Sequence, residues 1–234
     1  PDGCPGPRRG SARGERRRRP VLLQGRGGVR CVPAHWNADF AGAAELPRRA
    51  GELTLGLIGF GRIARLLATL AAPVFGRIAA HDPHADPAHW PAGVERCEDV
   101  AGLAAASDIL SLHVPLTPGT HGLVDGALLE RMRPGGFLVN VSRGELVDPS
   151  ALLACLDSGR LTGAALDVFP VEPPPADDPL RSHPRIQLSP HSAFLSDTSR
   201  RAYVRRPVEN VIAWHRTGRP LTPVIDPTTE GAAA

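Results

Sequence analysis

The sequence predicts an α/β fold: a doubly wound, mostly parallel sheet with an incomplete second domain. From residue 52 onward, short apolar runs alternate with helical segments, which is typical of a parallel sheet with helices on both faces. A glycine-rich turn joins the first apolar run to the first helix. No apolar run approaches the roughly 18 residues of a transmembrane helix, so we expect no membrane span.

The first strand, the glycine turn and the first helix follow one another directly. Residues 53–58 (LTLGLI) have the continuous apolar character of a buried parallel strand. Gly59 permits the tight turn, Gly61 lets a pyrophosphate approach the backbone, and the small Ala64 allows close packing of helix on strand. The helix, expected over residues 65–72, would present its N-terminus to the phosphates. This segment predicts a Rossmann-type dinucleotide-binding domain.

An acidic residue follows the second expected strand, residues 77–81. Asp82 lies 23 residues after Gly59, close to the roughly 20-residue offset of the acid that binds the adenosine ribose. A carboxylate there repels the 2′-phosphate of NADP, and neither His84 nor Ala85 supplies an Arg to bind it. We therefore expect NAD rather than NADP, although an Asp before a proline is in isolation more often a simple turn residue.

The alternation of strands and helices continues to residue 188. Further helices are expected over residues 100–106, 127–132 and 149–156, and further strands over 108–113, 137–141, 163–168 and 186–188. A proline-rich loop, residues 114–120, follows the strand that ends at residue 113. Ligands of doubly wound sheets bind at the carboxyl ends of the strands, so we expect this loop to border the cofactor.

Three polar residues follow three of these strands and should meet at one edge of the sheet. Arg143 can bind a carboxylate with its guanidinium fork. His191 can transfer a proton near neutral pH, and Glu172 beside it would orient the ring. The set suits a 2-hydroxy or 2-keto acid, with hydride exchange at a nicotinamide. Each residue also has a simpler interpretation: a solvated Arg, a charged loop and a structural His.

Several motifs together resemble the D-isomer-specific 2-hydroxyacid dehydrogenase family, over about residues 52–220. The motifs are residues 55–63 (LGLIGFGRI), 107–118 (SDILSLHVPLTP), 132–136 (MRPGG), 139–148 (VNVSRGELVD), 163–173 (GAALDVFPVEP) and 189–193 (SPHSA). The resemblance implies that Arg143, Glu172 and His191 bind substrate and transfer its proton. The glycines of the turn, Gly59 and Gly61, are already expected to bind NAD. The resemblance implies that further residues line the NAD site: Arg62, Ile63, Asp82, Pro115, Thr120, Val141, Ser142, Asp167 and Ser192. Asp167 would meet the nicotinamide amide.

The resemblance also divides the chain into segments. Residues 51–192 would form the NAD-binding domain, residues 35–50 a connecting segment, and residues 193–234 a C-terminal helix and tail left from the substrate domain. Family members carry a flavodoxin-like region before the glycine motif, which helps to hold the substrate and receives the last helix. Here only about fifty residues precede the motif. We therefore expect the helix of residues 199–214 to lack its usual partner and to leave apolar residues exposed, namely Val204, Val208, Val211 and Ile212.

The basic charge of the chain is concentrated at its start. The first 50 residues hold eleven Arg against four acidic residues, whereas the whole chain has a net charge of only +3 and no Lys. Residues 1–34 are rich in Arg, Gly and Pro and lack apolar periodicity, so we expect a disordered tail. A basic arm that binds nucleic acid is the weaker alternative, because no aromatic residues are interleaved with the arginines.

The cysteines bear on the cellular compartment, and the family resemblance bears on oligomeric state and activity. The four cysteines are far apart and form no CxxC pair, which favours a reducing cytoplasm and argues against a disulfide framework or a zinc site. The resemblance is compatible with a homodimer formed through the NAD-binding domain. We expect an NAD-dependent oxidoreductase of 2-hydroxy and 2-keto acids; the alternative is a non-catalytic NAD-binding module or an inactive, shortened dehydrogenase.

Overall fold

The computed structural model describes residues 48–222 of the 234-residue chain. All described residues belong to one compact unit, Leu46–Ala234. The tail expected over residues 1–34, and nearly all of the connecting segment expected over residues 35–50, lie outside the described residues. The proposed division of the chain into segments therefore stays a prediction.

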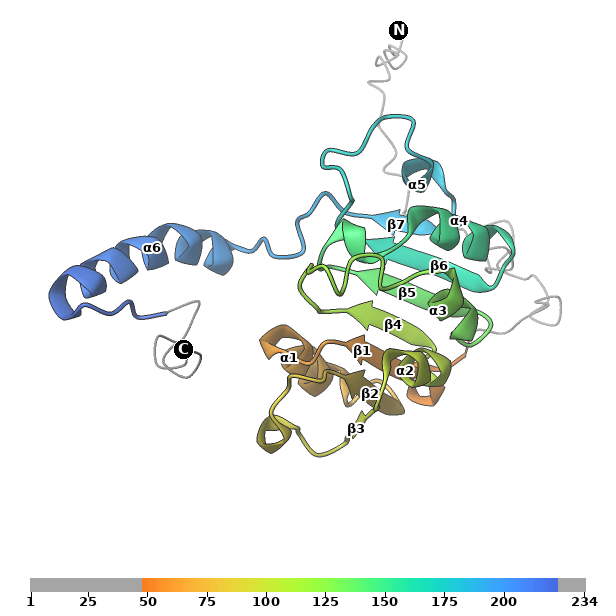
Figure 1. Cartoon of the computed structure of the whole chain (residues 1–234), viewed down its shortest axis with the longest axis horizontal. Helices are drawn as coiled ribbons and strands as arrows, with labels where there is room; N and C mark the ends of the chain where they lie inside the picture. The colour runs from red at the N-terminus through yellow and green to blue at the C-terminus, as the bar shows by residue number, and fades with distance from the viewer. Residues whose placement is uncertain (1–47, 223–234) are drawn as a thin grey trace, which may run out of the picture. The chain divides into compact units, whose positions relative to one another are not determined.

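The described part of the chain is built on a seven-stranded sheet (Figure 1). The strands are β1 (Thr54–Ile58), β2 (Arg77–His81), β3 (Val94–Arg96), β4 (Ile109–Leu112), β5 (Gly136–Asn140), β6 (Leu161–Leu166) and β7 (Ile186–Leu188). Every neighbouring pair is parallel, in the order β3-β2-β1-β4-β5-β6-β7. The order reverses between β1 and β4, the position at which doubly wound sheets bind ligands. The predicted fold class is confirmed.

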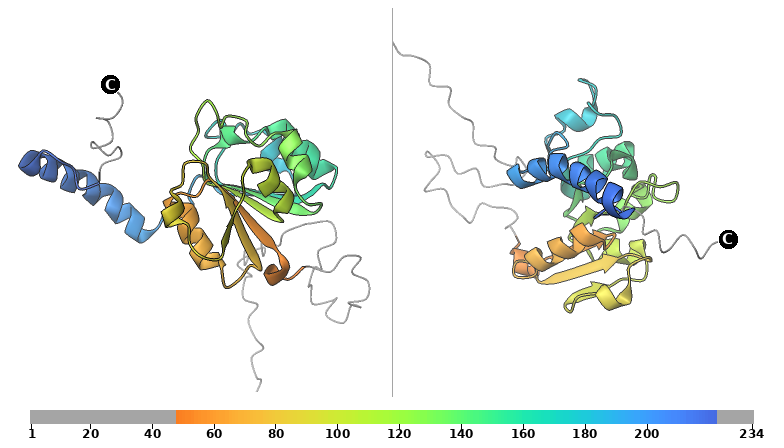
Figure 2. Two further views of the ribbon diagram at one scale, coloured as in Figure 1. Left: turned by 60° about the horizontal axis from the view of Figure 1, so that its bottom comes forward. Right: turned by 90° about the vertical axis from the view of Figure 1, so that its left-hand side faces the viewer.

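Helices cover both faces of this sheet (Figure 2). The helices that do so are α1 (Arg62–Ala71), α2 (Val100–Ala106), α3 (Gly126–Arg131) and α4 (Pro149–Asp157). The short α5 (Pro179–Ser182) lies beside β7, and α6 (Asp197–Thr217) packs on neither face. On one face α1 packs on β1 and β2 through a cluster that includes Leu57, Phe60 and Ala64. On the other face α2, α3 and α4 enclose a larger cluster around Leu110 and Leu138. Burial of these apolar side chains is the main stabilising contribution to such a fold.

Strand β3 and helix α5 are among the short elements that were not expected from the sequence. Strand β3 has only one apolar residue in three, and it forms because Ile78, Ala79 and Ala80 of β2 offer a parallel edge for pairing. Helix α5 is a single turn, begun by the Asp178 carboxylate, which accepts the N–H of Leu180 at 2.9 Å. Neither element has the length or periodicity on which a sequence-based prediction depends.

A buried carboxylate ties the amino edge of the sheet together. Asp108, just before β4, accepts the backbone N–H of Thr54 at 2.8 Å. It also forms ion pairs with Arg48 at 2.5 Å and Arg133 at 2.8 Å. Burial would raise the pKa of Asp108, but the Thr54 N–H and the two guanidinium groups outweigh burial and hold that pKa below its usual value.

We expect Asp108→Asn to lower the free energy of unfolding by about 1–3 kcal/mol, because one buried N–H and two guanidinium groups lose the negative charge and one of the two oxygens that accept from them. The lowered pKa of Asp108 adds stability that is complete above about pH 4 and is lost as the pH falls below it. Urea denaturation of both proteins should thus show a difference at pH 7 that shrinks in acid. Glu95→Gln, at the exposed ion pair with Arg77, is the control and should change stability by less than about 1 kcal/mol. An equal loss in both variants would contradict this account.

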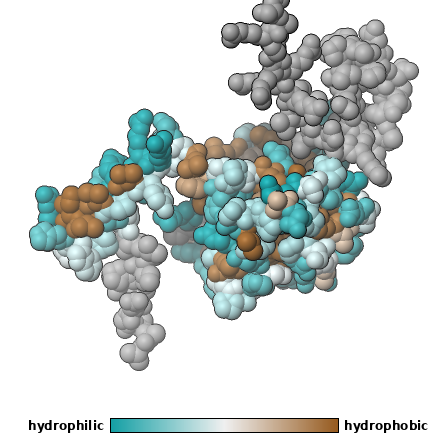
Figure 3. Space-filling model, turned by 90° about the horizontal axis from the view of Figure 1, so that it is seen from above, coloured by the Kyte–Doolittle hydropathy of each residue, from teal (hydrophilic) through white to brown (hydrophobic). Residues whose placement is uncertain are grey.

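Helix α6 is 21 residues long but has no buried residue. Ser196 caps it in a reciprocal capping box with Ser199, and Gly218, at φ 69°, ends it in the left-handed conformation. All four apolar residues expected to be uncovered are exposed: Val204, Val208, Val211 and Ile212. The space-filling view shows apolar surface along this helix (Figure 3). Among the described residues, no helix has the combination of length and apolarity needed to cross a membrane.

Candidate active site

The residues predicted to bind cofactor and substrate follow the carboxyl ends of the parallel strands. Gly59 and Gly61 follow β1, Asp82 follows β2, and the loop of residues 114–120 follows β4. The residues Val141, Ser142 and Arg143 follow β5, Asp167 and Glu172 follow β6, and His191 and Ser192 follow β7. Because the sheet is entirely parallel, all of these segments leave it at one edge.

The glycine turn has the backbone geometry that its sequence predicts. Gly59 adopts φ 86°, and a Cβ atom there would lie 2.8 Å from the backbone carbonyl of His113. A Cβ atom on Gly61 would meet no atom within 4 Å. Gly61 is also the N-cap of α1 and provides no side-chain acceptor for the first N–H groups of that helix. The turn therefore leaves open space and free N–H donors, which fits a bound pyrophosphate.

Asp82 is fixed beside the glycine turn. Its Oδ2 accepts the N–H of Phe60 at 2.8 Å, and its Oδ1 accepts the N–H of His84 at 2.9 Å. Both oxygens retain unused acceptor capacity, since an ionised carboxylate can accept about four hydrogen bonds. The residue is half-buried. This placement supports the ribose-binding role predicted from its spacing.

The loop after β4 is organised by Thr120. Its hydroxyl donates to the carbonyl of Pro115 at 2.7 Å and accepts the N–H of Thr117 at 2.8 Å. A shallow hollow of about 570 Å³ beside it is lined by Leu116, Thr117, Pro118 and His121. Pro115 and Thr120, both predicted to border the cofactor, thus belong to one compact loop at the point where the strand order reverses.

His191 and Glu172 are in direct contact. Nδ1 of His191 lies 2.7 Å from Oε2 of Glu172, and Oε1 of Glu172 accepts the N–H of Phe169 at 2.9 Å. The hydrogen bond from His191, together with the Phe169 N–H, holds the pKa of Glu172 below its usual value. An ionised Glu172 can only accept, so Nδ1 of His191 bears the shared proton and Nε2 is left for a substrate. The two side chains are 42% and 36% exposed, so a ligand can reach them.

A buried carboxylate holds the turn that contains His191. The backbone of His191 adopts φ 47°, an uncommon conformation for a residue other than glycine, and its N–H donates to the carbonyl of Asp167 at 2.8 Å. The Asp167 carboxylate accepts the hydroxyl of Ser189 at 2.5 Å and the N–H groups of Ser192 and Ala193 at 2.9 and 3.0 Å. Burial would raise the pKa of Asp167, but these hydrogen bonds outweigh burial and keep that pKa low.

Arg143 lies on the neighbouring turn, after β5. Its guanidinium is exposed, and Nη1 donates to the carbonyl of Ser142 at 2.7 Å. The charge of Arg143 is one of the groups that lower the pKa of Glu172, which places the two side chains in one electrostatic environment. Gly144 allows this approach, because a Cβ atom there would lie 2.0 Å from the carbonyl carbon of Phe169.

The structure thus brings the three predicted substrate residues to the same sheet edge as the glycine turn. Three residues that build this arrangement were not expected from the sequence: Asn140, Gly144 and Ser189. All three lie inside the motifs that resemble the dehydrogenase family, so the signal was present in the motif. Their roles depend on contacts with segments distant in the sequence, which no local pattern reveals.

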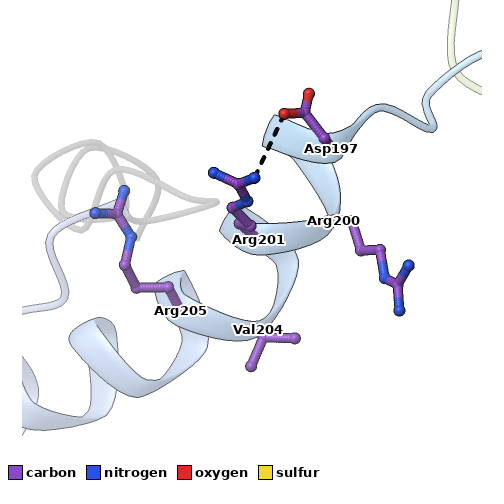
Figure 4. A pocket seen from close by; sticks show the side chains of 5 residues that line it. All are labelled: Asp197, Arg200, Arg201, Val204 and Arg205. Atoms are coloured by element: carbon purple, nitrogen blue, oxygen red, sulfur yellow. Dashed lines mark ion pairs between the residues drawn. The ribbon is translucent and has the colours of Figure 1, made fainter.

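Two further features of the described residues bear on ligand binding. No group of three or more His, Cys, Asp or Glu side chains within residues 48–222 is placed to hold a metal ion. A shallow hollow of about 600 Å³ is lined by Asp197, Arg200, Arg201, Val204 and Arg205, all on α6 (Figure 4). Arg201 forms an ion pair with Asp197 at 3.6 Å there. The walls of this hollow come from a single helix, and none of the predicted site residues lines it.

Comparison with known proteins is consistent with the geometry. Residues 32–193 match the family model described as the NAD-binding domain of D-isomer specific 2-hydroxyacid dehydrogenases. The (S)-sulfolactate dehydrogenase of Chromohalobacter salexigens is 44% identical over 177 residues, covering 72% of this chain and 57% of that protein. The glyoxylate reductase of Korarchaeum cryptofilum is 40% identical over 164 residues, covering 70% and 49%. The chain therefore spans about half the length of the curated relatives that it matches.

Solved structures show the same fold. The NAD-complexed D-isomer specific 2-hydroxyacid dehydrogenase from Lactobacillus delbrueckii ssp. bulgaricus superposes with a TM-score of 0.68 at 28% sequence identity. The similarity covers 77% of this chain and 58% of that chain.

Proposed function

Since this chain belongs to the D-isomer specific 2-hydroxyacid dehydrogenase family, we propose that it interconverts a 2-hydroxy acid and a 2-keto acid with NAD as cofactor. The observation that supports this most strongly is the 2.7 Å contact between His191 and Glu172 at the same sheet edge as the glycine turn. A module that only bound NAD would have no need for a histidine–carboxylate pair beside an exposed Arg. The catalytic activity is proposed for this chain, because its match covers only 57% and 49% of the two curated relatives.

Arg143 is the proposed substrate-binding residue. Its guanidinium offers parallel N–H donors that match the two oxygens of a carboxylate. The same cation would polarise the adjacent keto oxygen toward negative charge, which favours attack at the carbonyl carbon. The exposed position of Arg143 leaves these donors accessible.

His191 and Glu172 are the proposed proton-transfer pair. For reduction of a keto acid, protonated His191 donates from Nε2 to the keto oxygen as the hydroxyl forms. Glu172 accepts the Nδ1–H throughout, so the ring keeps one orientation. The left-handed backbone at His191 sets the direction of the ring, and Asp167 fixes that backbone.

The residues present fit a dinucleotide. Open space at Gly61 and uncapped N–H groups of α1 would receive the pyrophosphate, and Asp82 would receive the ribose hydroxyls. NAD, when bound, supplies or accepts the hydride of the reaction. The predicted contacts of Arg62, Ile63, Val141, Ser142, Asp167 and Ser192 with the cofactor remain part of this proposal.

We expect Asp82→Asn to shift the preference from NADH toward NADPH by about tenfold, ~1.4 kcal/mol, because the variant lacks the charge that repels a 2′-phosphate. Asn retains one acceptor for the N–H groups of Phe60 and His84. The two dissociation constants, measured by fluorescence titration, give the ratio. Glu98→Gln, an exposed carboxylate before α2, is the control. An unmodified chain that already preferred NADPH would remove the basis for the role of Asp82.

The proposal includes a cytoplasmic location and a homodimer. Cys97 and Cys155 are both free thiols, which is compatible with a reducing compartment. The dimer is inferred from the family resemblance, and sedimentation at several protein concentrations tests it.

The activity itself is tested by offering glyoxylate, pyruvate and hydroxypyruvate to the full chain with NADH and following the absorbance of NADH. Oxidation of NADH that depends on the keto acid is the expected result. Binding of NADH without any oxidation would instead support the non-catalytic alternative.

A further inference from the structure

We propose that Asn140 is the positioning residue for Arg143: its side-chain amide closes the turn that presents the guanidinium to the substrate carboxylate. The inference rests on the proposed function, because it explains how the substrate-binding residue of that site is held. Asn140 is the last residue of β5 and only 1% exposed, so its polar atoms depend on partners within the protein.

Both ends of the Asn140 amide bind the turn that follows it. Oδ1 accepts the N–H of Ser142 at 3.0 Å, and Nδ2 donates to the carbonyl of Arg143 at 2.8 Å. The Ser142 hydroxyl donates to the carbonyl of Leu112 at 2.9 Å, which anchors the turn to β4. The backbone that supports the guanidinium is therefore held by two hydrogen bonds to the Asn140 side chain and by one hydrogen bond to the neighbouring strand β4.

Asn140 also connects this turn to the segment that contains the proton-transfer pair. Its backbone carbonyl accepts the N–H of Asp167 at 3.0 Å, and the carbonyl of Asp167 accepts the N–H of His191 at 2.8 Å. A displacement at Asn140 would thus alter the spacing between Arg143 and His191. That spacing matters, because a misplacement of about 1 Å in a catalytic site can cost about a hundredfold in rate.

The chemistry of the position requires an amide. The turn needs one acceptor, for the Ser142 N–H, and one donor, for the Arg143 carbonyl. An ionised Asp has the same shape but only accepts, so it would place a negative oxygen against the carbonyl of Arg143. Protonated Asp recovers the donor. The Asn140→Asp variant should therefore lose the closed turn when Asp is ionised and regain it when Asp is protonated. If Asn140 only filled space, the turn would be the same in both protonation states of the variant.

The test uses the full chain with Asn140→Asp, Asn140→Ala and the control Ser107→Ala. Ser107 is fully buried at the opposite edge of the sheet and donates to the carbonyl of Leu103, so the control loses a buried hydrogen bond away from the site. NADH affinity is measured first by fluorescence. The affinity for oxamate, a carboxylate analogue of a 2-keto acid, is then measured on the NADH complex. Amide hydrogen exchange at Ser142 is the third readout.

We expect Asn140→Asp at neutral pH to weaken oxamate binding by about tenfold or more. NADH affinity should fall by clearly less, because Ser142 of this turn is one of many proposed cofactor contacts while Arg143 is the main proposed contact of the substrate carboxylate. Oxamate affinity of this variant, relative to the wild type, should recover as the pH falls. Asn140→Ala should accelerate exchange of the Ser142 amide by about tenfold, while Ser107→Ala should alter neither quantity. Unchanged oxamate affinity in Asn140→Asp, or an equal loss of NADH and oxamate binding, would overturn the inference.

The failure of the proposed function would look different. A wild-type chain that binds no oxamate in the presence of NADH contradicts the substrate site itself. In that case the exchange of the Ser142 amide alone decides the role of Asn140: faster exchange in Asn140→Ala supports the closed turn, and unchanged exchange rejects it.

Discussion

Replacing His191 with Gln should lower turnover of a 2-keto acid by about a thousandfold or more, because general acid–base groups contribute about 10²–10⁴-fold and Gln cannot release a proton. Gln can still donate to Glu172, which accepts from Nδ1 at 2.7 Å in the native protein. The glycine turn and Asp82 lie on other segments, so NADH affinity should change little. Steady-state rates and a fluorescence titration on the same sample measure both effects.

The control for this variant is His183→Gln. His183 contacts Asp157 at 3.3 Å, at the end of α4, and belongs to none of the segments at the carboxyl edge. It should retain the wild-type rate. If His191→Gln kept full activity, or if His183→Gln lost as much, the assignment of proton transfer to His191 would be wrong.

The Gly144→Ala variant should disrupt the site by steric overlap. A Cβ atom at residue 144 would lie 2.0 Å from the carbonyl carbon of Phe169 and 2.2 Å from the nitrogen of Pro170. Both contacts are with backbone, so no side-chain rotation relieves them. The segment that leads to Glu172 must move away, and Glu172 then loses its place beside His191. We expect turnover to fall by about a hundredfold, with a loss of stability of about 1–3 kcal/mol.

Gly126→Ala is the matched control, since it adds the same methyl group where a Cβ atom meets only the Ala151 side chain, at an ordinary 3.7 Å. This helical position should tolerate Ala or gain slightly from it. Thermal unfolding and keto acid reduction are compared for both variants. A Gly144→Ala protein with native stability and native turnover would mean that the close approach of the two turns is dispensable.

Much of the fold could be predicted because its strands are short apolar runs separated by helical spacing. Residues 77–81 were expected as a strand and form β2 over the same bounds. The helix expected over residues 100–106 and the strand expected over 186–188 also match α2 and β7. Boundaries of the remaining elements differ by up to three residues: the first helix was expected from residue 65 but begins at Arg62. The sequence does not distinguish the first turn of this helix from the glycine loop, because the N-cap is Gly61 and not a Ser, Thr, Asp or Asn that would mark the start of a helix.

The candidate site could be predicted in part, for a related physical reason. Arg143, Glu172 and His191 each follow a strand, and an all-parallel sheet delivers such residues to one edge. The contact between His191 and Glu172 depends on a positive φ at residue 191 and on hydrogen bonds from Asp167. Neither feature leaves a periodic trace in the sequence. Likewise, Asn140 resembles any strand residue until its amide is seen to close the next turn.

We propose that the glycine turn and the sheet edge beside it bind a dinucleotide, and the Gly61→Ala variant is the sharpest probe of that binding. A Cβ atom at residue 61 meets nothing within 4 Å, so the variant should fold as well as the wild type. The added methyl group would occupy the space that a pyrophosphate must approach. In a fluorescence titration with NADH, we expect saturable binding to the wild-type chain and a loss of affinity of at least about tenfold in Gly61→Ala. Absence of NADH binding by the wild type, or equal affinity in both proteins, would contradict it.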